Sequence, residues 1–160
     1  MKILIALAFA ALLAGCQSAP AMSNVRITLE RGVCFGACPD YAVTITGDGQ
    51  VTYHGRRFVR VTGEQHATAS HADVAHLVSM LEGARFFELR DSYRGQVTDL
   101  PSYRVTYERG GRIKTVTDYA GEMAGMPHAV REIEAEIDRV GQTEQWVRRE
   151  AGDNSTPPAK

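Results

Sequence analysis

The sequence YAVTITGDGQVTY, residues 41–53, contains two stretches of alternating apolar and polar residues joined by a glycine-rich turn. Side chains of a β-strand point alternately to opposite faces of its sheet, so this alternation predicts two half-buried strands. The Asp48-Gly49 step tolerates the positive φ angles that a tight hairpin turn requires. The stretch therefore predicts a β-hairpin with one face directed toward a core.

A second hairpin is predicted further along the chain. Residues 103–107 (YRVTY) alternate in the same way, a glycine pair follows, and residues 112–117 form the return strand. Within that strand Ile113 and Val116 fall on opposite faces, so the pattern allows a β-bulge there. The two hairpins align without gaps, which indicates either an internal duplication or generic strand composition. Residues 25–29 (VRITL) predict a further short strand.

Each hairpin is followed by a segment with helical periodicity. Ser70 is placed to cap the first helix and Gly83 to end it, whereas the second opens at Pro127 and ends at Gly141. The charged residues of the second helix, Glu134 among them, are assigned to its exposed faces. The two buried stripes are predicted to consist of Val74, Leu77, Val78 and Leu81, and of Val130, Ile133, Ile137 and Val140.

Together these elements predict an α+β fold in the order β-ββα-ββα, with antiparallel hairpins forming a sheet and two helices packed on one of its faces. Residues 25–150 form this single domain, and residues 143–150 add a short helix that packs Trp146. Residues 151–160 lack any apolar period and are predicted to be a disordered tail.

The N-terminus has the pattern of a secretion signal. Lys2 precedes an apolar stretch, residues 3–14, that falls short of the roughly 20 residues a membrane span needs. The ending LAGC, residues 13–16, resembles the lipobox of bacterial lipoproteins. The resemblance implies that residues 1–15 are a signal peptide and that Cys16 is lipidated, with palmitate among the acyl groups. Residues 16–24 are then a flexible tether between the lipid and the domain.

A lipid on Cys16 implies attachment to a membrane outside the cytoplasm. Gln17 stands where an aspartate would resemble an inner-membrane retention signal, which favours the outer membrane and a periplasmic domain. The chain has 18 Lys and Arg against 19 Asp and Glu, so it lacks the basic footprint of a nucleic-acid-binding protein. The expected partners are the membrane, through the N-terminal lipid, and another envelope protein.

The segment CFGACP, residues 34–39, predicts a disulfide between Cys34 and Cys38, because Cys16 is assigned to the lipid and the envelope is oxidising. Three alternatives stay open: thiol redox catalysis, an oxidant-sensing disulfide, and copper handling. Cys-x-x-x-Cys-Pro is similar to the metal loop of the Sco family of copper-delivery proteins. Two thiolates and one histidine would suit a soft metal. The histidines available for this are His54, His66, His71, His76 and His128.

A wider resemblance extends from about residue 25 to residue 147. Its motifs are LER (29–31), CFGxCPxY (34–41), GDG (47–49), YxG (53–55), DxY (91–93), TDxP (98–101) and DY (118–119). These motifs resemble a family of bacterial envelope proteins classed as domain of unknown function 6438. The resemblance implies a fold unit and a location, and it assigns no activity, cofactor or catalytic residue.

No catalytic residue or metal ligand is predicted, because the nucleophile-elbow, zinc-helix and phosphate-loop motifs are not in the sequence. A surface site is predicted from polar and aromatic residues, namely Phe35, Tyr41, Tyr93, Asp99, Asp118 and Tyr119. A weaker hypothesis uses Asp99 and Asp118 as general acid and base, against ordinary turn-capping roles. The leading hypothesis is a non-enzymatic binding or envelope-assembly module. The rival is a thiol redox or copper-handling protein using Cys34 and Cys38.

Overall fold

The computed structural model describes residues 22–147. The predicted signal peptide, most of the predicted tether, residues 148–150 of the predicted domain and the predicted tail lie outside the described residues. The described part of the tether is a 3₁₀ helix, η1 (Met22–Asn24). Between residues 22 and 147, none of the helices has the length and apolar character needed to cross a membrane.

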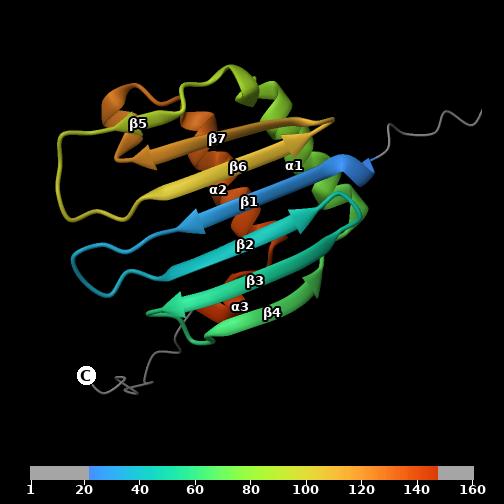
Figure 1. Cartoon of the computed structure of the whole chain (residues 1–160), viewed down its shortest axis with the longest axis horizontal. Coiled ribbons are helices and arrows are strands. Elements are labelled where there is room, and N and C mark those ends of the chain that lie inside the picture. The colour runs from blue at the N-terminus through green and yellow to red at the C-terminus, as the bar shows by residue number, and fades with distance from the viewer. Residues whose placement is uncertain (1–21, 148–160) are drawn as a thin grey trace, which may run out of the picture.

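One seven-stranded sheet forms the framework of the domain, with the strand order β4-β3-β2-β1-β6-β7-β5 (Figure 1). Neighbouring strands are antiparallel, except that β5 is parallel to β7. This arrangement confirms the predicted α+β class and places the first strand at the centre, between the two predicted hairpins. The strands are β1 (Val25–Arg31), β2 (Asp40–Thr46), β3 (Gln50–Arg57), β4 (Gly63–Thr68), β5 (Ser92–Arg94), β6 (Tyr103–Arg109) and β7 (Arg112–Tyr119).

The two edge strands, β4 and β5, are additions to the predicted order. The β4 sequence GEQHAT has no apolar alternation, and its residues are all at least partly exposed. β5 has only three residues, too few to establish a period. Because β4 follows the first hairpin while β5 precedes the second, the similarity of the two hairpins does not extend to the edges of the sheet.

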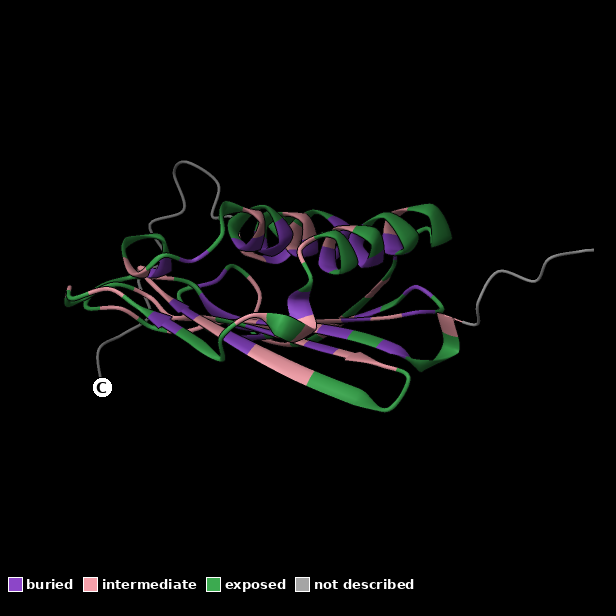
Figure 2. Ribbon diagram, turned by 90° about the horizontal axis from the view of Figure 1, so that it is seen from above, coloured by how far each residue is buried: buried purple, intermediate pink, exposed green. Residues whose placement is uncertain are grey.

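Two helices, α1 (His71–Gly83) and α2 (His128–Val140), cover one face of the sheet, and their buried sides face it (Figure 2). All eight residues predicted for the two apolar stripes are buried. The Ser70 hydroxyl accepts a hydrogen bond from the Asp73 amide at 3.0 Å, which confirms the predicted cap. Pro127 is the N-cap residue of α2, one position before the helix.

Short helical segments complete the core. They are η2 (Phe86–Glu88), η3 (Gly121–Ala124) and α3 (Glu144–Val147). Trp146 of α3 is buried, as predicted, and it stacks on Tyr53 with ring centroids 4.9 Å apart. The loop between β3 and β4 is tied to the same helix, since the Val61 amide donates to the Trp146 carbonyl at 2.9 Å.

The bulge that the sequence pattern allowed in the second hairpin is not present. β6 and β7 pair in continuous register, with Val105 opposite Val116. Ile113 lies on the other face, opposite Glu108, where it is 68% exposed. Val116 and Ile113 therefore lie on opposite faces of a regular strand. The strand pairing stays regular because Ile113 is exposed to solvent.

The face of the sheet that carries no helix is polar. Five threonines lie opposite one another across five strands, and the Thr28–Thr44 and Thr106–Thr115 hydroxyl pairs are 3.0 and 2.9 Å apart. Glu30 forms an ion pair with Arg104 on the same face, at 3.6 Å. The five residues of the row are Thr115, Thr106, Thr28, Thr44 and Thr52. We call this surface the open face.

Candidate binding site at the loop end of the sheet

Four loops meet at one end of the sheet, which we call the loop end: residues 32–39, 58–62, 95–102 and 120–127. η1 and the tight turns of both hairpins lie at the opposite end (Figure 1). Six large apolar side chains are exposed among the described residues, and five of them lie on these four loops. These five are Val33, Phe35, Phe58, Leu100 and Met123.

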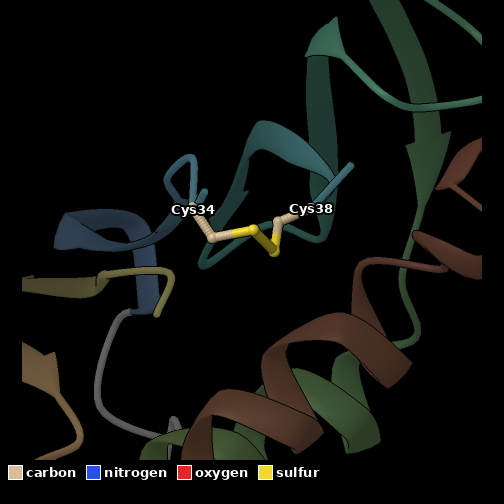
Figure 3. The surroundings of a disulfide bond; sticks show 2 residues. All are labelled: Cys34 and Cys38. Atoms are coloured by element: carbon tan, nitrogen blue, oxygen red, sulfur yellow. A yellow bond between two sulfur atoms is a disulfide. The ribbon is translucent and has the colours of Figure 1, made fainter. Parts of the chain in front are cut away.

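The cysteine loop joins β1 to β2 at this end. The Cys34 and Cys38 sulfurs lie at disulfide distance, and the Cα atoms are 5.7 Å apart, within the usual range for such a bond (Figure 3). The pair closes a small loop that presents Phe35, whose side chain is 88% exposed. An apolar ring held at this exposure by a short closed loop is the most prominent feature of the loop end.

Cavities open between the described residues of the loop end. The largest, of about 650 Å³, lies beside the cysteine loop, and its apolar wall includes Pro39, Phe58 and Val147. A cavity of about 270 Å³ shares Pro39 and Val147 with it and also has Cys38 in its wall. A third, of about 300 Å³, lies below Leu100. The largest has the volume of a ligand pocket, which typically begins at about 300 Å³.

A row of polar and aromatic side chains closes the core beneath these cavities. In the register of the sheet, successive members of the row lie directly opposite one another on five neighbouring strands. Three polar residues of α2 are spaced so that they share one side of the helix, and two of them, Arg131 and Asp138, contact this row. We call the eight residues the polar seam: Tyr41, Arg31, Tyr103, Asp118 and Tyr93 from the sheet, and Arg131, Glu134 and Asp138 from α2.

Asp138 is the centre of one half of the seam. Its carboxylate accepts hydrogen bonds from Arg31 Nε at 2.8 Å, Arg31 Nη2 at 2.5 Å and the Tyr41 hydroxyl at 2.7 Å. The Thr143 hydroxyl donates to it at 2.9 Å. Burial, followed by the nearby Asp138 carboxylate, raises the pKa of Tyr41. Burial lowers the pKa of the Arg31 guanidinium, whereas the Asp138 carboxylate raises it. The net result is a pKa above its ordinary value.

Asp118 is the centre of the other half. One oxygen of its buried carboxylate accepts from the Gly121 amide at 2.6 Å, and the other accepts from Arg131 Nη1 at 3.0 Å. The same nitrogen of Arg131 lies 3.4 Å from a Glu134 oxygen. The Tyr103 ring joins the two halves, with the guanidinium carbons of Arg31 and Arg131 4.4 and 5.4 Å from its centroid.

Glu134 is a buried acid in the middle of the seam. Its residue is 2% exposed, so its assignment to an exposed helix face is wrong. The spacing contains the signal, because Glu134 lies four residues after Val130 and three before Ile137, inside the apolar stripe. Burial, and then the Asp118 carboxylate, raise the pKa of Glu134 to about 8 against the opposing effect of Arg131.

The six residues predicted as a surface site lie in different environments. Tyr41, Tyr93 and Asp118 are buried in the polar seam, Phe35 and Asp99 are exposed, and Tyr119 is partly exposed. Asp99 accepts from the Thr98 hydroxyl at 3.1 Å, and it does not line the cavity that contains Asp118. Tyr119 lies under the Arg94 guanidinium, with 4.9 Å to the ring centroid.

The five seam residues that were not singled out from the sequence are Arg31, Tyr103, Arg131, Glu134 and Asp138. Arg31, Tyr41, Tyr93 and Asp118 each belong to a different motif of the resemblance described above. Along the chain, each of these four residues lies 10 to 52 positions from the next. The strand order brings the four residues into one row. The motifs are separate in the sequence, and the fold shows that they share a place in the polar seam.

The histidines lie apart from the cysteine loop cavity. All five are exposed, and none lines the cavity that includes Cys38. Within residues 22–147, no group of three or more His, Cys, Asp or Glu side chains is arranged to hold a metal ion. Arg31 and Tyr41 are the polar neighbours that share the cavity with Cys38 and Asp138.

Comparison with known proteins gives a family and no activity. No curated protein is similar enough to this chain to be counted as a relative. The family model described as Domain of unknown function (DUF6438) matches residues 25–141. The matched range contains the whole sheet, both long helices, the cysteine loop and every residue of the polar seam. The chain therefore belongs to this family of domains of unknown function.

Proposed function

We propose that this protein is a lipid-anchored envelope lipoprotein whose domain binds another envelope protein through the loop end. The observation that carries the proposal is the gathering of Phe35, Phe58 and three further exposed apolar side chains on the loops at one end of the sheet, where Phe58 also lines a cavity of about 650 Å³. Exposed apolar side chains that cluster beside a pocket are typical of interaction sites, whereas scattered ones need no explanation.

The position of the N-terminus agrees with this role. A chain anchored through Cys16 enters the domain at η1, and β1 then runs the length of the sheet toward the loop end (Figure 1). A domain tethered at the η1 end presents its four loops away from the attachment point. The apolar loops are then available to a partner in the periplasm, with the outer membrane as the proposed site of attachment.

The open face is the less suitable docking surface. Its central row consists of threonines, and its charges are paired across strands, as in Glu30 with Arg104. The centre of a protein–protein interface is usually depleted of charges and enriched in aromatic residues. Phe35 and Phe58 give the loop end that character, and the open face has only Ile113 as a large exposed apolar side chain among the described residues.

The polar seam supports a structural rather than catalytic role for its charged groups. Asp138 accepts four hydrogen bonds, and each oxygen of Asp118 accepts one, from donors in the seam and its neighbours. Among residues 22–147, no buried side-chain nitrogen or oxygen lacks a hydrogen-bond partner. Groups that are fully occupied in this way hold the loop end in shape beneath the proposed binding surface.

One observation favours the rival function. Cys38 lines a cavity together with Arg31, and a nearby cation stabilises a thiolate and so favours thiol–disulfide exchange. A copper site would need a third ligand, and no histidine lines that cavity. Thiol trapping across a redox series separates the two functions. A reduction potential above about −300 mV supports the redox protein, and a lower one supports a structural bond.

The binding proposal is tested by photocrosslinking in the native host. A benzophenone amino acid replaces Phe35 or Phe58 in the lipidated chain, and in the control it replaces Ile113, which is exposed at the opposite end of the sheet. We expect one shared adduct from the two loop-end positions and none from the control. Equal adducts from all three positions, or none from Phe35 and Phe58, would contradict the proposal. The Cys16→Ser variant tests the anchor, since it should leave the membrane fraction.

A further inference from the structure

Apart from its three tyrosines, the polar seam contains five ionisable groups, which is an odd number. Arg31 and Arg131 supply two positive charges, and Asp118 and Asp138 supply two negative ones. Glu134 is the fifth group, between the two aspartates along the seam. With a proton on Glu134 these five groups sum to zero charge, and without it they carry one excess negative charge. The excess falls on the buried carboxylates of Asp118 and Glu134, where it is costly away from water.

The charged groups that act on Glu134 come from α2 itself and from two strands packed against it. Arg31 of β1 and Arg131 of α2 stabilise its charged form, whereas Asp118 of β7 and Asp138 of α2 oppose it. Both guanidinium groups lie near the Tyr103 ring of β6. The single contact of Glu134 with a cation, 3.4 Å from Arg131, is shared with Asp118, which lies closer to the same nitrogen. The positive charge of Arg131 therefore mainly compensates the negative charge of Asp118 and not that of Glu134.

We propose that Glu134 is a proton-operated switch that controls how tightly α2 closes the loop end of the sheet. With its proton bound, Glu134 completes a neutral seam and α2 stays against the sheet. When the proton passes to solvent, the excess charge favours an opened seam in which the carboxylate is hydrated. The switch follows from the seam itself and does not depend on the proposed binding role.

The opening would reach both smaller cavities. Tyr103 forms part of the wall of each one. Asp118 and Arg131 line the cavity of about 300 Å³, while Arg31 and Asp138 line the cavity of about 270 Å³. A change of charge at Glu134 is thus transmitted to groups in both cavity walls, and the shape of the loop end becomes dependent on pH.

The direction of the pH effect follows from the raised pKa of Glu134. The pKa of this acid is about 8 in the closed seam and returns to its ordinary value of 4.5 when hydrated. The closed state is therefore favoured in full below pH 4.5, and this preference is lost as the pH rises toward 8. Across that interval the opening constant should rise about tenfold per pH unit, because one proton is released.

Hydrogen exchange measured by mass spectrometry tests the switch in the full-length lipidated protein in nonionic detergent. After correction for the intrinsic exchange rate, the opening constant of the α2 amides should rise about 100-fold from pH 5.5 to 7.5. Glu134→Gln keeps the shape of the side chain and cannot ionise, so it should abolish this dependence and leave α2 more protected at pH 7.5.

Two variants on the same helix serve as controls. Glu132→Gln removes an exposed acid, and His128→Asn removes an exposed group whose pKa is raised by its hydrogen bond to Glu122. Glu132→Gln should keep the wild-type slope, whereas His128→Asn should lower it only by the small share that the exposed His128–Glu122 pair contributes. An unchanged slope in Glu134→Gln, or a flat profile in the wild type, would overturn the proposal.

If Glu134→Gln does not fold, infrared spectroscopy of the wild-type protein decides. A protonated-carboxyl band that is present at pH 6.5 and lost by pH 9.5 supports the switch, and a spectrum without that band at pH 6.5 refutes it.

Discussion

Asp138 offers the strongest test of the polar seam as a stabilising element. The variant Asp138→Ala removes the acceptor of both Arg31 bonds and of the Tyr41 hydroxyl. Arg31 would then keep a charge at a position where its side chain is 19% exposed, and the hydroxyl of the buried Tyr41 would lose the acceptor of its proton. The loss of a partner costs more than the interaction itself contributes, because the remaining polar group stays desolvated.

The magnitude can be worked from these contacts. Breaking a fully buried ion pair costs about 3–5 kcal/mol, and the partial exposure of this pair reduces that to about 2–3 kcal/mol. An unpaired buried hydroxyl adds about 1 kcal/mol. We therefore expect Asp138→Ala to lower the free energy of unfolding by about 3–4 kcal/mol. For a domain of this size the corresponding fall in Tm is roughly 12 °C.

Urea unfolding of the lipid-free Cys16→Ser chain, followed by circular dichroism, measures the change. Asp91→Ala is the matched control, because Asp91 also forms an ion pair, with Lys114, and its side chain is 87% exposed. A surface pair of this kind contributes at most about 1 kcal/mol. A double-mutant cycle with Tyr41→Phe isolates the share of the hydroxyl. If Asp138→Ala and Asp91→Ala cost the same, the seam does not stabilise the loop end.

Two further predictions concern a pair of glycines and the cysteine pair. Gly55→Ala should lower the free energy of unfolding by about 2 kcal/mol or more, because its Cβ would lie 2.2 Å from the Val61 carbonyl oxygen. Gly83→Ala has open space around it and should raise the free energy of unfolding by about 0.5–1 kcal/mol. Thermal unfolding measures both variants, and equal effects would contradict the packing argument. The double variant with Cys34→Ser and Cys38→Ser should lower the free energy of unfolding, measured in urea, by about 2 kcal/mol, because so short a loop constrains little of the unfolded chain. A double variant that does not fold would show that the bond has a larger role.

Local elements could be predicted from the sequence because each one carries its own period. The alternation in residues 41–53 identified β2 and β3, and the stripe from Val74 to Leu81 identified the buried side of α1. The edge strand β4 could not be predicted in this way, since a strand at the edge of the sheet is exposed on both sides and needs no apolar alternation. The exposure of Ile113 could not be predicted either, because its apolar side chain gives no indication that it would face solvent.

The candidate site depends on the order of the strands. Tyr41, Asp118 and Tyr93 were singled out as separate polar residues, and their meeting in one row follows from the order β2-β1-β6-β7-β5 and its register. The α2 residues contact that row because the helix crosses several strands. No sequence period encodes such a meeting, since its members come from six elements.

The sequence by itself determined the fold class, the two hairpins, the buried faces of both helices and the cysteine pair, because these depend on residues close together in the chain. Only the tertiary structure decided that Glu134 is buried, that the polar seam closes the core, and that the exposed apolar loops share one end of the sheet. The physical reason is that hydrophobic periodicity sets which side of an element is buried, whereas the partners of a buried polar group are set by how distant elements are ordered in space.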